Sequence, residues 1–191
     1  MAGRQRFSIT DHCNPRLQGC QAGDFKCRRN HSVSFNHTIT FTVNGKKKEL
    51  VVDVRQSLLE VLREQMGMIS VKQGCAVGEC GACTVLLDDA PVDACLYLAI
   101  WADGRSIRTV EGESRNEMLS KVQQAFVNEG AVQCGICTPG FVMAATAFVE
   151  KHKHQKASRH DIRRGLAGNL CRCTGYETIV TAVQKCLDDE T

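Results

Sequence analysis

Four cysteines near the middle of the chain have a spacing that could bind iron. Three of them follow one another as C-x4-C-x2-C and the fourth comes after eleven further residues, giving Cys75, Cys80, Cys83 and Cys95. Three thiolates from one loop and a fourth from beyond a strand are typical of a plant-type [2Fe-2S] cluster. The spacing therefore predicts one such cluster at these four residues.

The loop that carries these cysteines is rich in glycine, with Gly74, Gly78 and Gly81. Glycine permits positive φ and removes Cβ bulk, so backbone N–H groups can point at the sulfurs and stabilise their negative charge. A four-cysteine zinc site is the alternative, but such sites usually combine two C-x2-C pairs. Zinc explains neither the four-residue gap nor the glycines, so iron is favoured. Glu79, in the same loop, is expected to face solvent.

A second set consists of Cys134 and Cys137 and, after 33 residues, Cys171 and Cys173. The C-x-C pair is too tight for the common zinc knuckle. The Thr138-Pro139 pair places Cys137 just before a helix N-terminus, where the helix dipole favours a thiolate. Taken alone, this set leaves zinc open as an alternative. Beside a ferredoxin-type set in the same chain, it predicts a second iron–sulfur cluster.

The residues on either side of the first set carry the signals of strands and a helix. Hydrophobicity alternates on both sides of an Asn44-Gly45 turn, which predicts a β-hairpin. Ser57 with Glu60 forms a capping box and predicts a helix that ends near Gly67. Further strands are predicted at 84–87 and 106–110, with a turn at Asp88-Asp89. Together these elements make a small α+β unit.

The hydrophobic period becomes helical in the second half of the chain. Ser114 with Glu117 has the form of a capping box and predicts a helix to about Asn128. Thr138 is the expected N-cap of a nearly all-apolar helix that runs through Val149, as suits an element central in its bundle. Two more helices are predicted, from Ser158 to near Gly168 and from Tyr176 to Leu187, with Cys186 as a buried core thiol.

These elements predict an α+β fold with two cluster-binding domains. The first is a β-grasp, plant-type ferredoxin-like domain at 35–112, and the second is an all-α four-helix bundle at 113–191. Two helix hairpins would bring the four thiols of the second set to one end of that bundle. Residues 1–34 are polar without an apolar period and are predicted to be an N-terminal extension.

The extension has three cysteines of its own, spaced seven apart: Cys13, Cys20 and Cys27. A third metal site with His12 or His31 as the fourth ligand is an alternative. No glycine-rich loop or packed frame surrounds these cysteines, so the sequence favours no metal there.

Composition excludes several classes of protein. With 43% hydrophobic and 24% charged residues, the chain has an ordinary globular composition. The 12 cysteines are too sparse for a disulfide scaffold, so they predict metal sites and the reducing cytoplasm. The longest apolar runs are nine residues, which predicts no membrane span. The net charge of the chain is +3, and residues 1–34 carry +4, so the remaining residues sum to −1. Without a basic surface there, and with only 5% aromatic residues, nucleic-acid binding is not expected.

Three longer motifs together resemble the iron–sulfur subunit of the molybdenum hydroxylases. They are Val71-Lys-Gln-Gly-Cys-Ala-Val-Gly-Glu-Cys-Gly-Ala-Cys-Thr-Val85, Gln133-Cys-Gly-Ile-Cys-Thr-Pro-Gly140 and Arg164-Gly-Leu-Ala-Gly-Asn-Leu-Cys-Arg-Cys-Thr-Gly-Tyr176. The resemblance covers about 37–188. The segments 95–101 and 107–112 look most like the separate iron–sulfur subunit of bacterial xanthine dehydrogenases. The extension at 1–34 matches no part of the family pattern.

The resemblance implies an electron-transfer subunit of an oxidoreductase, with no catalytic residue of its own. Electrons would pass from a molybdenum cofactor on a large subunit to the helical-domain cluster, then to the ferredoxin-like cluster and to FAD on a medium subunit. Gln133 and Cys173 would lie against the pterin of the molybdenum cofactor, with Cys173 also ligating iron. Xanthine or hypoxanthine is the substrate that the resemblance favours.

Other functions stay open as alternatives. One is the iron–sulfur subunit of an aldehyde dehydrogenase or of another N-heterocycle dehydrogenase. Another is a free-standing ferredoxin-like carrier, but the helical domain argues against it, because a diffusing ferredoxin needs no second bundle. A zinc-bound structural module is the third.

Overall fold

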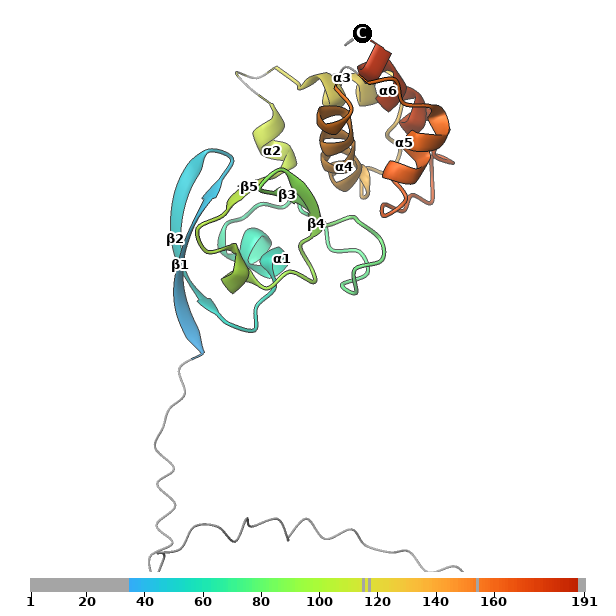
Figure 1. The fold of residues 1–191 in the computed structure, drawn as a ribbon. Coiled ribbons are helices and arrows are strands. Elements are labelled where there is room, and N and C mark those ends of the chain that lie inside the picture. The colour runs from blue at the N-terminus through green and yellow to red at the C-terminus, as the bar shows by residue number, and fades with distance from the viewer. Residues whose placement is uncertain (1–34, 115, 117, 154, 189–191) are drawn as a thin grey trace, which may run out of the picture. The chain divides into compact units, whose positions relative to one another are not determined.

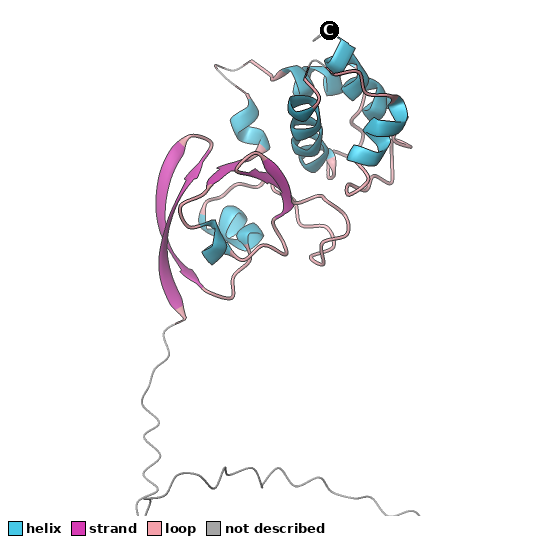
Figure 2. Ribbon diagram, viewed as in Figure 1, coloured by secondary structure: helices cyan, strands magenta, loops and turns pink. Residues whose placement is uncertain are grey.

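The computed structural model describes residues 35–114, 116, 118–153 and 155–188 (Figure 1). Its first half contains a mixed five-stranded sheet with the order β2-β1-β5-β3-β4 (Figure 2). The strands are β1 Asn36–Val43, β2 Lys46–Asp53, β3 Thr84–Leu87, β4 Ala90–Asp93 and β5 Ser106–Arg108. β1 runs parallel to β5, and the other neighbouring pairs are antiparallel.

The predicted hairpin is confirmed as β1 and β2, with Val43 opposite Lys46. Its two turn residues, Asn44 and Gly45, have φ of 49° and 77°. A two-residue turn whose central residues both have positive φ matches the twist of the flanking strands, which is why Asn-Gly is favoured there. The alternating apolar residues of β1 are buried, so the hairpin packs one face on the core.

The capping box of Ser57 and Glu60 is also present, and it starts the short helix α1 Leu58–Glu60. The chain continues as a π-helix, Val61–Gln65, and a 3₁₀ helix spans Ala99–Ala102. Buried side chains of these segments and of the sheet form one hydrophobic core. The helix therefore covers the inner face of the sheet.

Five further helices occupy the second half: α2 Val110–Glu113, α3 Lys121–Asn128, α4 Thr138–Lys151, α5 Arg159–Gly165 and α6 Glu177–Asp188. α4 contacts α3, α5 and α6, and it also packs against β3 and β4. This double contact explains its apolar composition, because most of its side chains between Gly140 and Val149 are buried. Helical residues form a second hydrophobic core.

Several predicted boundaries are wrong. The helix expected with Ser114 as its N-cap instead has its N-cap at Ser120, which forms a capping box with Gln123. Glu117 lies outside the described residues. Met118 and Leu119 are exposed, at 71% and 46%, so apolar spacing alone misplaced the start. The strand expected at 106–110 ends at Arg108, and the β4 strand and the short α2 helix had no sequence prediction.

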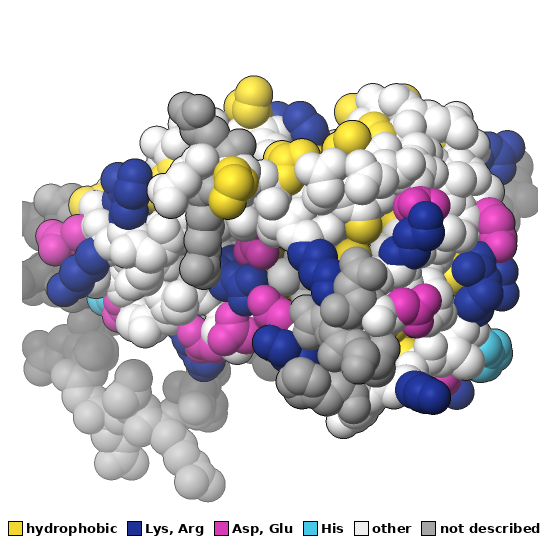
Figure 3. Space-filling model, turned by 90° about the horizontal axis from the view of Figure 1, so that it is seen from above, with side chains coloured by type: hydrophobic (Ala, Val, Ile, Leu, Met, Phe, Trp, Pro, Cys, Tyr) yellow, Lys and Arg dark blue, Asp and Glu magenta, His cyan; other side chains and the backbone are white. Residues whose placement is uncertain are grey.

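The start of α4 differs by one residue, because Cys137 is the N-cap and Thr138 is already helical. None of the helices in the described part of the chain is long and apolar enough to cross a lipid bilayer. On the face drawn in Figure 3, basic and acidic side chains are interspersed with hydrophobic ones.

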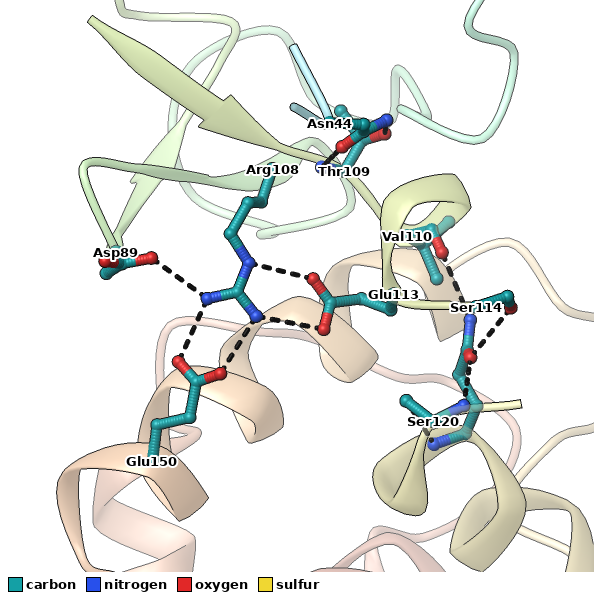
Figure 4. A network of polar contacts seen from close by, with 10 residues as sticks. Asn44, Asp89, Arg108, Thr109, Val110, Glu113, Ser114, Ser120 and Glu150 are labelled. Atoms are coloured by element: carbon teal, nitrogen blue, oxygen red, sulfur yellow. Dashed lines mark hydrogen bonds and ion pairs between the residues drawn. The ribbon is translucent and has the colours of Figure 1, made fainter. Parts of the chain in front are cut away.

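Arg108, at the end of β5, connects the sheet to the helical half (Figure 4). It donates two hydrogen bonds to Glu113 of α2, at 3.1 and 3.0 Å, and two to Glu150 of α4, at 3.1 and 2.9 Å. A fifth goes to Asp89 in the β3–β4 turn, at 2.9 Å. The planar guanidinium suits such multiple pairing. Because the Glu113 side chain is only 7% exposed, losing Arg108 would leave a buried carboxylate unpaired.

We expect Arg108→Met to destabilise the protein by about 2 kcal/mol, less than a fully buried pair would lose, because Arg108 is partly exposed. For a chain of this length the midpoint of thermal unfolding should fall by about 4–8 °C. The matched control is Arg105→Met, which removes an exposed pair with Asp88 at 2.8 Å. That change should cost at most about 1 kcal/mol. Equal losses in the two variants would contradict a connecting role for Arg108.

Candidate metal centres

The first cysteine set lies in the loop before β3 and in the turn after β4. Its thiols interact in two neighbouring pairs: Cys75 with Cys80, and Cys83 with Cys95. Cys83 is buried, and the other three are partly exposed. The fold therefore brings each of the four predicted ligands next to a second one.

Backbone N–H groups point at the sulfur of Cys75. Those of Val77 and Glu79 donate to Sγ at 3.4 and 3.3 Å. These hydrogen bonds, that of Val77 first, lower the pKa of Cys75 to about 6. A group with this pKa is mostly thiolate above pH 6, so Cys75 is prepared to bind a cation at neutral pH. Glu79 itself is exposed, as expected.

The glycines of this loop act differently from one another. Gly78 and Gly81 have positive φ, as expected, and so does Ala76. Gly74 does not have positive φ, so only the predicted removal of Cβ bulk applies to it. What Gly74 supplies is space, because a Cβ there would lie 2.8 Å from Sγ of Cys80. The loop therefore needs glycine here to let a cysteine sulfur approach the backbone.

Burial has the opposite effect on Cys83, which is 3% exposed. Desolvation raises the pKa of this thiol to about 12, with the neighbouring Cys95 adding to the effect. The Asp93 carboxylate lies 3.9 Å from Sγ of Cys83. Such a thiol loses its proton at neutral pH when a metal ion takes the place of that proton. The site is therefore suited to a metal that binds thiolate strongly.

The second set comes from two loops that the helices bring together. Cys134 and Cys137 precede α4, and Cys171 and Cys173 lie between α5 and α6. Sγ of Cys173 lies 3.6 Å from Sγ of Cys134, and both residues are exposed. Cys137 interacts with the neighbouring thiol of Cys171, and both are partly buried. This set also consists of two thiol pairs.

The pKa of Cys137 does not follow the helix dipole, which favours a thiolate at this position. Cys137 does lie at the N-cap of α4, but its pKa is raised to about 12. Burial is the largest cause, and the adjacent Cys171 is the next. Desolvation of the charged form and repulsion from a second thiolate outweigh the dipole here.

Cys171 has its own hydrogen-bond donors. Burial alone would raise its pKa, but donors from Thr174 bring the pKa below its ordinary value. The Thr174 hydroxyl donates to Sγ at 3.1 Å and the Thr174 N–H at 3.4 Å. Each set therefore contains one cysteine whose thiolate is stabilised by the loop around it.

The two cysteine loops also touch each other. Leu170 N–H donates to the carbonyl of Cys80 at 2.9 Å. The Asn169 amide, 6% exposed, donates to the carbonyl of Gly81 at 2.8 Å and to Oγ1 of Thr84 at 3.0 Å. Leu170 directly precedes Cys171 in the chain, so this hydrogen bond connects Cys80 of the first set to the residue next to Cys171 of the second set. Asn169 fixes the approach of the two loops.

Sequence reasoning missed Asn169, Thr174 and Tyr176 as site residues. All three lie within the 164–176 motif, on either side of the second C-x-C pair. The available signal was their nearness to Cys171 together with side chains that form hydrogen bonds. Gln133, expected to contact a pterin, is exposed beside Cys134, and Arg172 is exposed as well. Cys186 is buried at 1%, as predicted.

The pairing of thiols suits a two-iron cluster. Among the described residues, no three His, Cys, Asp or Glu side chains converge on a position for a single metal ion. A cysteine-ligated [2Fe-2S] cluster instead takes two thiolates on each of its two irons. Thiolate sulfur is also the donor type that iron–sulfur clusters use. The donor sets therefore fit two such clusters.

Family models match both halves of the chain. One, described as a 2Fe-2S iron-sulfur cluster binding domain, matches residues 41–105. The other, described as a [2Fe-2S] binding domain, matches residues 109–184. The fold and the matches define the class, which is an iron–sulfur protein with two [2Fe-2S] domains.

Known relatives narrow this class. The chain is 56% identical over 157 residues to the xanthine dehydrogenase iron-sulfur-binding subunit of Escherichia coli O157:H7, covering 82% of this chain and 97% of that subunit. It is 48% identical over 145 residues to the nicotine 6-hydroxylase small subunit of Paenarthrobacter nicotinovorans, covering 76% and 86%. The chain belongs to the iron–sulfur subunits of the molybdenum hydroxylases.

Solved structures agree with this assignment. The structure of quinoline 2-oxidoreductase from Pseudomonas putida 86 is similar with a TM-score of 0.78 at 42% identity. The match covers 82% of this chain and 96% of that chain. An aldehyde oxidoreductase from Desulfovibrio desulfuricans ATCC 27774 matches with a TM-score of 0.76, where this chain spans 17% of the longer protein.

The N-terminus of α4 packs against the first cysteine loop at a position that admits only glycine. A Cβ on Gly140 would lie 2.1 Å from the carbonyl oxygen of Gly81. We therefore expect Gly140→Ala to push α4 away from this loop and to cost about 1–3 kcal/mol. The control is Gly168→Ala, where a Cβ meets no neighbouring atom within 4 Å. Unfolding midpoints and iron content of both variants provide the measurement, and an unaffected Gly140→Ala protein would contradict the tight packing.

Proposed function

We propose that this chain is the electron-transfer subunit of a molybdenum hydroxylase and that it holds two [2Fe-2S] clusters. The first cluster is ligated by Cys75, Cys80, Cys83 and Cys95, and the second by Cys134, Cys137, Cys171 and Cys173. The observation that carries the proposal is the pairing of all eight thiols in two sets, together with the hydrogen bond that joins the backbone of one set at Cys80 to that of the other at Leu170. When bound, such clusters supply one-electron transfer between a reduced molybdenum cofactor and FAD.

The protein's own contribution is to hold the two sets at a constant separation. Asn169 and Leu170 tie the second loop to the first, and Gly140 lets α4 approach the same loop. Electron transfer between two clusters requires no conformational change, so we expect the protein to hold them rigidly. This rigidity is also what argues against a free-standing carrier with a single exposed cluster.

We further propose domain limits of 35–112 for the ferredoxin-like domain and 113–191 for a four-helix [2Fe-2S]-binding domain, with 1–34 as an extension. The separation of the two hydrophobic cores supports the division. The mutual contacts of α3, α4, α5 and α6 support a four-helix arrangement. The nine described cysteines are all thiols, which supports a reducing compartment, the cytoplasm.

The partners follow from the exposure of the second set. Cys134 and Cys173 are exposed, and Gln133 is exposed beside them. This face suits contact with the pterin of a molybdenum cofactor held by a large subunit, with Gln133 and Cys173 nearest to it. FAD would be held by a medium subunit. The 56% identity to a xanthine dehydrogenase subunit supports xanthine or hypoxanthine as the substrate of the complex.

Relatives with other substrates support an alternative within the same function. The similar subunits include those of a nicotine 6-hydroxylase and, at 42% identity, of a caffeine dehydrogenase from Pseudomonas sp. (strain CBB1). The substrate pocket is not expected in this chain, so a different N-heterocycle or an aldehyde would leave the roles of its cysteines unchanged.

Metal content tests the ligand sets directly. The purified chain should be brown and hold about four iron atoms and four acid-labile sulfides. Cys137→Ser and Cys80→Ser should each lose about half of the iron, because each removes one ligand of one cluster. Cys186→Ala, a buried cysteine outside both sets, is the control and should keep all of it. Stoichiometric zinc without visible absorption would contradict iron at these sites.

Electron transfer is tested in the assembled complex with xanthine as the reductant under anaerobic conditions. Cys137→Ser should leave the reduction of molybdenum intact but slow the reduction of flavin severely. Cys80→Ser should also slow flavin reduction, with the second set still reduced by substrate. Rapid-freeze EPR separates the two variants, once iron content and assembly have been verified. Flavin reduction at the wild-type rate in both variants would contradict the proposed function, whereas turnover of another heterocycle alone would correct only the substrate.

A further inference from the structure

The Thr174 hydroxyl lies between the sulfur of Cys171 and the backbone N–H of Tyr176. Its oxygen accepts a hydrogen bond from Tyr176 N at 3.2 Å, and it lies 3.1 Å from Sγ of Cys171. A threonine hydroxyl has one proton and two acceptor positions. Since the oxygen accepts from Tyr176, the proton is directed to the sulfur. The chain N–H···O–H···S therefore polarises the hydroxyl toward Cys171.

The surrounding loop holds this arrangement in place. The Tyr176 hydroxyl accepts a hydrogen bond from Cys171 N at 3.0 Å, which closes the loop on itself. The Tyr176 ring packs edge-on against Phe141, a fully buried residue of α4, with 6.2 Å between centroids. Tyr176 also has a positive φ of 68°, which an L-residue adopts only when its surroundings impose it. The Thr174 hydroxyl is thus a preorganised donor.

A donor fixed on a ligand sulfur acts on the electron affinity of the cluster. Reduction of a [2Fe-2S] cluster adds one electron and breaks no bond to the protein, so the ligand sulfurs become more negative. A hydrogen bond to such a sulfur therefore stabilises the reduced form more than the oxidised form. Hydrogen bonds to the sulfurs are among the established determinants of cluster potential.

We propose that Thr174 sets the reduction potential of the cluster held by the second cysteine set, by donating its hydroxyl hydrogen bond to Cys171. The inference rests on the proposed function, in that Cys171 ligates iron. Thr174 is a positioning residue, because it acts through Cys171 and not on the substrate. At Cys75 the corresponding donors are the backbone N–H groups of Val77 and Glu79, which side-chain substitution cannot remove.

The test is a redox titration of the full-length, cluster-loaded protein with dithionite, in which EPR measures the reduced fraction of each cluster. Thr174→Val keeps the branched shape but removes the donor, and Thr174→Ser keeps the donor. The control is Thr178→Val on α6, whose hydroxyl is buried and has no hydrogen-bond partner among the described residues. In Thr174→Val the equilibrium constant for reduction of the second cluster should fall about tenfold, which is about 59 mV for one electron. Thr174→Ser and Thr178→Val should match the wild type.

The first cluster serves as an internal reference, and its potential should not change in any variant. Equal potentials in Thr174→Val and Thr178→Val would overturn the inference, as would equal shifts in Thr174→Val and Thr174→Ser, which would indicate packing alone. If Thr174→Val fails to retain the cluster, Thr174→Ala takes its place. Loss of iron from both would assign Thr174 to holding the loop and would also overturn the inference. Absence of the second cluster from the wild type would instead overturn the proposed function.

Discussion

The hydrogen bonds between the two cysteine loops are the constraint on which the rest of the structure depends. Asn169 is almost fully buried and bonds to Gly81 and Thr84, so an amide that was not satisfied there would cost about 1–3 kcal/mol. The neighbouring Leu170 bonds to the carbonyl of Cys80. The two hydrophobic cores are formed by separate halves of the chain, and this junction determines how their cysteine sets face each other.

A second connection lies away from the cysteines, where Arg108 joins β5, α2 and α4. These two attachments, together with the packing of α4 on the sheet, restrict rotation of one half against the other, which a single hinge would not do. This arrangement suits a protein whose role is to keep two redox centres at a constant distance. It also explains why α4 is apolar on nearly all sides, because it packs on the sheet as well as on the other helices.

The thiols within each set differ in their readiness to lose a proton. The pKa of Cys75 is lowered to about 6 by backbone donors, whereas burial raises the pKa of Cys83 to about 12. The second set shows the same contrast, since the pKa of Cys171 is lowered and that of Cys137 is raised to about 12. Metal loading must therefore displace protons from the buried thiols, which couples cluster assembly to folding of the loops.

The sequence by itself determined what depends on near neighbours: the cysteine spacings, the Asn44-Gly45 hairpin, the capping box at Ser57 and the helix start at Ser158. The helix start expected at Ser114 was wrong, because the capping box is formed by Ser120 and Gln123. Only the tertiary structure decided the contacts made over long separations. Asn169 meets Gly81 across 88 positions, and the burial that raises the pKa of Cys137 comes from packed elements. Burial and long-range hydrogen bonding depend on the whole fold, so spacing alone does not reveal them.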